Sequence, residues 1–179
     1  MNESRALHHI CRDGHAVRVG DYYLPQMETA TLRGELFYCF GELVLAQGET
    51  KICQLKTGNI DTYAYGLRLQ SNITVLTFQI HENPTITDGT TALTPINFDR
   101  TSTNEALYRI YTDPTDVSGG TLIKDYRHYS LPNAPVQTAM EGNGTFMFLK
   151  RNTSYSLTFI NGDNGERKIF AQFIIGENK

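Results

Sequence analysis

One strand-and-turn unit occurs twice in the middle of this chain, and it restricts the fold more than any other feature. The first repeat runs from Phe78 to Leu93 (FQIHENPTITDGTTAL) and the second from Tyr108 to Ile123 (YRIYTDPTDVSGGTLI). An offset of 30 residues superposes Ile80 on Ile110, Pro84 on Pro114, Thr85 on Thr115, Gly89 on Gly119 and Thr91 on Thr121. The alternative to an internal repeat is chance reuse of common turn residues.

Each repeat combines an alternating strand, an Asn-Pro or Asp-Pro step, a glycine and a further strand. Pro84 and Pro114 have no backbone N–H, so a central strand must end near each of them. Gly89 and Gly119 can adopt positive φ, which allows the chain to reverse. We therefore predict that these four residues are structural turn positions without a ligand role, and that Gly89 and Gly119 are equivalent. The repeats then form two hairpin-like units in an all-β domain.

Short apolar or alternating runs, separated by Gly, Pro and Asn turns, account for most of the chain after residue 33. Strands are expected near residues 36–45, 51–56, 62–69, 73–81, 122–129, 145–149, 155–160 and 167–175. Gly41 predicts a bulge or bend within the first of them. Regular short strands of this kind predict an antiparallel jelly roll or β-sandwich for residues 34–179.

The clearest strands lie near the C-terminus. Apolar residues alternate along two runs: Tyr155, Leu157 and Phe159 in the first run, and Ile169, Ala171, Phe173 and Ile175 on one face of the second. The turn-rich sequence from Asn161 to Glu166 separates the two runs. Together they predict a β-hairpin from Tyr155 to Ile175.

Residues 1–33 have neither a helical nor a strand period, and we interpret them as an irregular N-terminal arm. No segment of the chain is a convincing amphipathic helix. The arm nevertheless carries apolar side chains, which predicts that it packs on another chain rather than on its own domain. The predicted partner contacts are Leu7, Ile10, Val17, Tyr22, Tyr23 and Leu24.

Composition excludes several functional classes. The net charge is −3 and the basic residues are dispersed, so no basic stripe for nucleic acid or an anionic membrane is present. No apolar run approaches the length of a membrane span, and the N-terminus lacks the apolar core of a signal peptide. The three cysteines, Cys11, Cys39 and Cys53, are too few and too scattered for a disulfide framework.

Two groups of side chains resemble metal ligands. The first comprises His8, His9, Cys11 and His15, whose spacing matches no structural zinc pattern. The second comprises His81, Glu82 and His128 on strands, without the glycines and the second histidine of a cupin. The sequence also lacks a Gly-x-Ser-x-Gly elbow, a phosphate-binding loop and an Asp-x-Asp-x-Asp calcium run. We therefore expect no catalytic, metal or cofactor site, and no enzymatic activity.

The segment HENPTITDGTTALTPINFDR, from His81 to Arg100, resembles a segment of tailed-bacteriophage virion structural proteins. Those proteins carry a "PT" step, a "DGT" turn and a T-x-x-N-x-[ND]-R ending, which corresponds here to Thr94–Arg100. A second "PT…G" unit follows in them, as at residues 113–122. Near their C-terminus they have two apolar strands around an Asn-Thr turn, as at residues 146–160. The resemblance covers about residues 60–176 and leaves out the arm.

This resemblance implies a capsid decoration (cement) protein with a jelly-roll body. Such a protein is made in the host cytoplasm and sits on the outer capsid surface of the virion. Its partners are the major capsid protein and other copies of itself, as a dimer or trimer, and it carries over no catalytic residues.

Two other functions stay open from the sequence. One is a head- or tail-fibre β-sandwich that binds a host carbohydrate or receptor, with Tyr22, Tyr23, Tyr63, Tyr65, Tyr126 and Tyr129 as stacking candidates. The other is a cupin-like metalloenzyme that uses His81 or His128.

Overall fold

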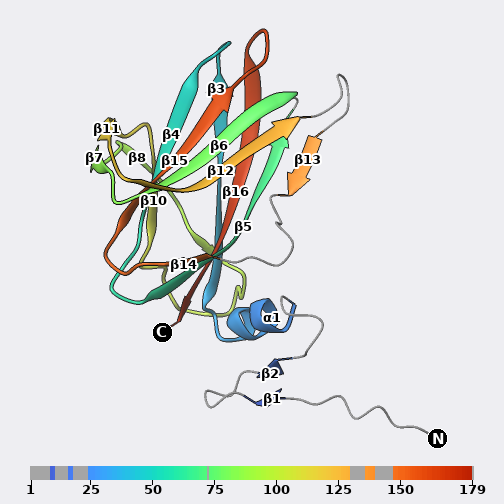
Figure 1. The fold of residues 1–179 in the computed structure, drawn as a ribbon. Helices are drawn as coiled ribbons and strands as arrows, with labels where there is room; N and C mark the ends of the chain where they lie inside the picture. The colour runs from blue at the N-terminus through green and yellow to red at the C-terminus, as the bar shows by residue number, and fades with distance from the viewer. Residues whose placement is uncertain are drawn as a thin grey trace, which may run out of the picture.

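The computed structural model of the protein describes residues 9–10, 16–17, 24–71, 73–129, 136–139 and 147–178. One helix and many strands make up this part of the chain (Figure 1). In chain order they are β1 (His9–Ile10), β2 (Ala16–Val17), α1 (Leu24–Leu32), β3 (Leu36–Leu45), β4 (Thr50–Lys56), β5 (Asp61–Ser71), β6 (Val75–Glu82), β7 (Thr85–Thr87), β8 (Thr91–Leu93), β9 (Ile96–Asn97), β10 (Arg109–Thr112), β11 (Thr115–Ser118), β12 (Thr121–Tyr129), β13 (Val136–Ala139), β14 (Met147–Leu149), β15 (Ser154–Asn161) and β16 (Arg167–Asn178).

Two antiparallel sheets pack face to face as a β-sandwich (Figure 1). The first sheet has the order β13-β5-β16-β3-β9, and β14 also pairs with β5. The second sheet has the order β12-β6-β15-β4-β10-β8. The all-β sandwich predicted from the sequence is therefore confirmed.

The winding of the chain is compatible with the jelly roll that the sequence predicted. The chain alternates between the two sheets: β3 and β5 belong to the first sheet, and β4 and β6 to the second. The same alternation returns after β12, because β14 and β16 belong to the first sheet and β15 to the second. The late strands fill the gaps between the early ones, because β16 lies between β3 and β5 while β15 lies between β4 and β6. Each sheet thus joins segments from both ends of the sequence.

Alternating apolar residues form the core between the sheets, as strand geometry requires. The alternating apolar residues of the two C-terminal strands are all buried there. Phe78 and Phe159 face each other across β6 and β15 with ring centroids 5.0 Å apart. Burial of a side chain of this size stabilises a fold by about 1.5 to 3 kcal/mol.

The two repeats pair with each other rather than folding into separate hairpins. β6 pairs with β12, β7 with β11 and β8 with β10. The first strand of each repeat thus lies beside the last strand of the other. The middle strands of the two repeats, β7 and β11, pair with each other. Our expectation of two hairpin-like units was wrong, because the turn residues fix where strands end but not which strands they join.

Two other local predictions also need correction. β15 and β16 do not form a hairpin, since β15 belongs to the second sheet and β16 to the first. Turn signals such as those at Asn161–Glu166 mark a reversal and do not distinguish a hairpin from a connection between sheets. Of the bulge or bend predicted at Gly41, the bulge is absent, because Gly41 pairs with Ala171 in a continuous β3–β16 register. An added Cβ at Gly41 would lie 3.2 Å from Leu93, so the glycine instead makes room for that side chain.

Residues 24–32 form a helix that the sequence did not reveal. Pro25 occupies its first turn, where the missing N–H costs nothing. Its C-terminal end has Gly34 at φ 64°, with Gly34 N donating to Thr31 O and Glu35 N donating to Ala30 O. This is the paired hydrogen-bond pattern of a Schellman cap. The last part of the predicted irregular arm is therefore ordered by local capping.

Candidate functional site

The outer surface of the first sheet, which faces away from the core, is apolar and aromatic. On β3, Phe37, Cys39, Leu43 and Leu45 point into the core, so alternation places the residues between them on the outer surface. Those outer residues include Leu36, Tyr38, Phe40 and Val44. A sheet that is apolar on both faces normally has both of them covered.

Helix α1 covers one end of this outer surface. Ala30 packs with Leu36 and Ile174 in a small buried cluster that also contacts Met27 and Tyr65. The Tyr65 ring lies over Gly176, where an added Cβ would come within 2.4 Å of it. At least part of the predicted arm therefore packs on its own domain, which corrects our expectation for residues 24–32.

Beyond the helix lies a group of residues that we call the Phe40 patch, which comprises the exposed Phe40, Val44, Phe98 and Phe170 and the half-buried Tyr38. The Tyr38 ring lies 4.8 Å from that of Phe98 and 6.0 Å from that of Phe40. In the β3–β16 ladder Phe40 pairs with Gln172 and Phe170 with Glu42, so the two phenylalanines are diagonal neighbours on one face. Phe40 is 60% exposed and Phe170 is 50% exposed.

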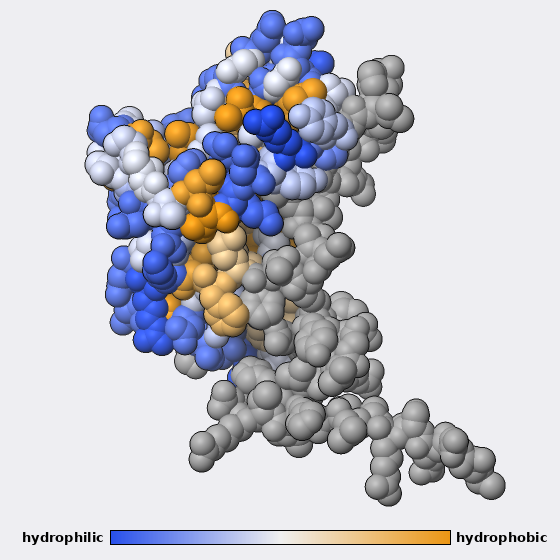
Figure 2. Space-filling view, viewed as in Figure 1, coloured by the Kyte–Doolittle hydropathy of each residue, from blue (hydrophilic) through white to orange (hydrophobic). Residues whose placement is uncertain are grey.

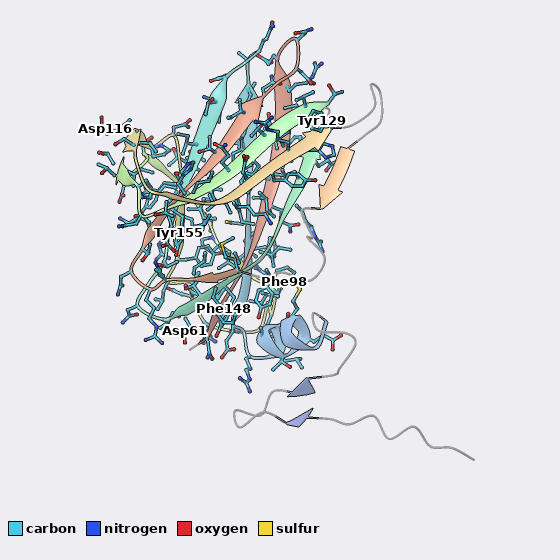
Figure 3. All side chains as sticks on the ribbon, in the orientation of Figure 1. Asp61, Phe98, Asp116, Tyr129, Phe148 and Tyr155 are labelled. Atoms are coloured by element: carbon cyan, nitrogen blue, oxygen red, sulfur yellow. The ribbon has the colours of Figure 1, made fainter. Side chains whose placement is uncertain are left out.

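A second group, the Phe148 patch, consists of Tyr63, Tyr65 and Phe148 on the same sheet. Phe148 pairs with Tyr63 in the β14–β5 ladder, and their rings are 4.9 Å apart in an edge-to-face arrangement. Phe148 is 67% exposed, while burial and then the nearby Asp61 carboxylate raise the pKa of Tyr63. Figure 3 shows Phe98 and Phe148 at the helix end of the sandwich.

The outer surface of the second sheet is polar by contrast. Its central positions include Gln54, Ser156 and Thr158, all buried, and His81, which is half-buried. Gln54 Nε2 donates to Asp88 Oδ1 at 3.0 Å, and Lys56 Nζ lies 2.7 Å from Asp88 Oδ2. These contacts attach the loop between β7 and β8 to β4. The two outer surfaces of the sandwich thus differ, and the first sheet carries the better candidate for binding another protein.

The sequence-predicted turn residues lie at the junctions of the two repeats. Pro84 follows β6 and Pro114 follows β10, and both precede short strands. Gly119 has φ 65° and open space around it, whereas Gly89 is pressed against the Thr112 carbonyl. Gly120 is the structural counterpart of Gly89, because an added Cβ at Gly120 would approach Glu82 and Pro84 in a similar way. Gly89 and Gly119 are therefore not structurally equivalent, because the second repeat accommodates an extra turn residue.

The structure tests few of the predicted partner contacts. Leu7, Tyr22 and Tyr23 lie outside the described residues. Ile10 and Val17 belong to the two-stranded ribbon β1–β2, and Leu24 begins α1, but only their backbone is described. The other arm candidates, His8, Cys11 and His15, also lie outside the described part.

The proposed metal ligands on strands are not brought together. His81 pairs with Ser156 and Leu122, whereas His128 pairs with Leu76 at the other end of the β6–β12 ladder. Glu82 instead contacts the Lys150 ammonium and accepts a hydrogen bond from Tyr155 Oη at 3.3 Å. Within the described ranges, no three His, Cys, Asp or Glu residues are grouped so that they could hold a metal ion.

The tyrosines considered for carbohydrate stacking are also dispersed. Tyr63 and Tyr65 lie together on β5, with ring centroids 6.2 Å apart. Tyr126 and Tyr129 lie on β12 in the other sheet, and Figure 3 shows Tyr129 at the end of the sandwich opposite Phe148. Tyr22 and Tyr23 are outside the described residues.

Sequence reasoning missed the Phe40 patch. The sequence Leu36–Leu45 contained a signal, because apolar residues occupy both the odd and the even positions and therefore both faces of a strand. We attributed that pattern to a bend at Gly41 rather than to a strand with two apolar faces.

Comparison with known proteins gives no family for this chain, since it matches no protein-family model and no curated protein sequence. No helix in the described part of the chain is long and apolar enough to cross a membrane.

Proposed function

We propose that this protein is a non-enzymatic structural component of a tailed-phage virion, and that it attaches to the capsid shell as a decoration protein. The observation that supports attachment is the Phe40 patch on the outer surface of the first sheet. Contiguous exposed aromatic side chains mark protein-binding surfaces more often than they mark free surface. The phage assignment itself rests on the sequence resemblance of residues 60–176.

The sandwich has the properties that such a role needs. A decoration protein stabilises a shell by burying area across its subunits, so it requires a stiff body and many copies rather than a reactive group. In this proposal the major capsid protein is the principal partner, and copies of the chain associate as a dimer or trimer on the outer capsid surface. Binding only to the assembled shell then stabilises the shell by mass action.

The test is reconstitution on particles that lack the protein. We expect the double variant Phe40→Ser/Phe170→Ser to bind at least tenfold more weakly than the natural protein, because it removes the exposed rings from the patch. The double variant Leu122→Ser/Ile123→Ser is the matched control, since it changes two exposed apolar residues on the second sheet. Circular dichroism and melting curves show whether all variants remain folded.

Copy number and heat-induced DNA release complete the test. A decoration protein is present in hundreds of copies per particle and raises the temperature at which DNA is released. Equal release temperatures with and without the protein, or binding that survives loss of both phenylalanines, would reject the proposal.

The Phe148 patch supports a second candidate, a fibre module that binds a carbohydrate. Tyr63, Tyr65 and the exposed Phe148 offer clustered ring faces of the kind on which sugars stack. This candidate predicts a few to a dozen copies per particle. It also predicts glycan binding that Phe148→Ala abolishes and Phe40→Ser does not.

A further inference from the structure

An apolar cavity of about 90 Å³ lies inside the sandwich, between β5, β14 and β16 of the first sheet and β4, β6, β12 and β15 of the second. Its inner wall consists of buried core side chains, among them Leu55, Phe78, Leu157 and Phe173. A cavity with such walls holds no water in a favourable hydrogen-bonded position. It is therefore suited to an apolar ligand.

The cavity is open on one side. Ile80, Lys124 and Met147 also line it, but they are only half-buried, and they lie on β6, β12 and β14. The opening is therefore on the side of the sandwich where β12 faces β14. Figure 2 shows apolar atoms gathered on this side, near the start of β12.

Lys124 is the only charged residue among the described ones that line the cavity. Every second residue of β12 from Lys124 onward is half-buried and faces the core side of the sheet. These residues are Lys124, Tyr126 and His128. Among the described residues, Lys124 forms no ion pair and no hydrogen bond with a side chain. A lysine at the edge of an apolar cavity, without an ion-pair partner among the described residues, can pair with an anion that binds at the opening.

Ala64 is a small residue in the wall of the cavity. It pairs with Ile175 in the β5–β16 ladder, and Ile175 belongs to the core, so the Ala64 side chain faces the cavity as well. A larger side chain at residue 64 would therefore occupy the cavity.

We propose that this cavity binds the aliphatic end of an amphipathic carboxylate, with the carboxylate paired to the Lys124 ammonium at the opening. The cavity is smaller than the ~150 Å³ cavity that accommodates benzene. It therefore fits a narrow, unbranched chain better than an aromatic ring. The site is independent of the Phe40 patch, so its test does not depend on the capsid role.

The experiment uses three six-carbon probes with different head groups: hexanoate, hexanol and hexylamine. Met147 lines the cavity, so the NMR signal of its ¹³C-labelled methyl group reports occupancy directly, and Met147→Leu assigns that signal. We expect a saturable shift with hexanoate, a dissociation constant about tenfold higher for hexanol, and still weaker binding of hexylamine.

Two variants separate the roles of volume and charge. Ala64→Leu fills the cavity and should abolish the shift with every probe. Lys124→Met should keep hexanol binding but remove the preference for hexanoate. Arg127→Met is the matched control, because residue 127 lies at an exposed position of the same strand, and it should change neither affinity.

Three results would overturn the proposal. The first is the absence of a saturable Met147 shift with hexanoate. The second is unchanged binding to a folded Ala64→Leu protein, or to Ala64→Val if the leucine variant does not fold. The third is a preference for hexanoate that persists in Lys124→Met, in which case Lys124 serves only as an inward charge that protects an edge strand.

Discussion

Asn83 and Asp113 adopt the same left-handed backbone conformation, with φ values of 54° and 51°. They lie 30 residues apart, at the same position of the two repeats, and each immediately precedes a proline. Left-handed conformations are uncommon outside glycine, and Asn and Asp tolerate them best. The two repeats therefore share their backbone geometry at this step.

The glycines at the repeat junctions should differ in their sensitivity to substitution. An alanine Cβ at Gly89 would lie 1.9 Å from the Thr112 carbonyl oxygen, so Gly89→Ala should lower the free energy of unfolding by about 2 to 3 kcal/mol or more. Gly119 has positive φ but open space, so Gly119→Ala should cost only about 1 kcal/mol. Urea denaturation measures both values.

Gly48→Ala is the control for this series, because Gly48 also combines positive φ with open space. It should match Gly119→Ala. Gly120→Ala should resemble Gly89→Ala, since Gly120 combines φ 84° with contacts to Glu82 and Pro84. Equal costs at Gly89 and Gly119 would contradict the structural difference between them.

Stability should fall in acid through Asp163, whose side chain is 3% exposed. Burial alone would raise its pKa, but hydrogen bonds from Thr74 and Val75 and the Arg167 guanidinium lower it to about 2. A depressed pKa stabilises the fold above the unfolded-state value of 3.8, and that contribution is lost as the pH falls from about 4 to about 2. We expect a loss of about 1 to 2 kcal/mol over this range.

Asp163→Asn tests the assignment. It should be less stable than the natural protein at pH 7 and should lose less stability between pH 4 and pH 2. Asp116→Asn is the control, because Asp116 is exposed. Identical pH profiles for the natural protein and Asp163→Asn would show that another carboxylate is responsible.

Cys39 and Cys53 should be unreactive in the folded protein. Burial raises the pKa of each thiol to about 12, so almost no thiolate is present at pH 8. Mass spectrometry after iodoacetamide treatment should find both residues unmodified until the protein is unfolded in guanidinium chloride. Rapid modification of either one without denaturant would show that the core opens locally.

Removal of residues 2–30 should destabilise the sandwich without preventing its folding. Met27 and Ala30 pack on Leu36 and Ile174, and their loss exposes this apolar surface. We expect a decrease of about 2 to 4 kcal/mol in the free energy of unfolding, measured by urea denaturation. A matched variant with Ala30→Asp should cause a comparable decrease, because it buries a charge in the same contact. Unchanged stability in both would mean that α1 contributes nothing to the domain.

The sequence predicted the strands and their core faces well but predicted their partners poorly. Alternation is a local property, so Tyr155, Leu157 and Phe159 could be assigned to the core from their spacing alone. Pairing is not local, and the hairpin expected between residues 155 and 175 failed because both strands are inserted between earlier strands of opposite sheets. Helix α1 was missed because Thr29 and Thr31 interrupt its apolar pattern, although Pro25 and Gly34 mark its two ends.

The position of β15 and β16 also determines when the protein can fold. Each lies between two earlier strands of its sheet, and both follow all the other described strands in the sequence. During synthesis, β3, β4, β5 and β6 leave the ribosome long before the strands that join them. The nascent chain therefore carries unpaired strand edges until β15 and β16 have emerged, a state in which edges readily pair with the wrong chain. The native sandwich can close only after β16 has left the ribosome.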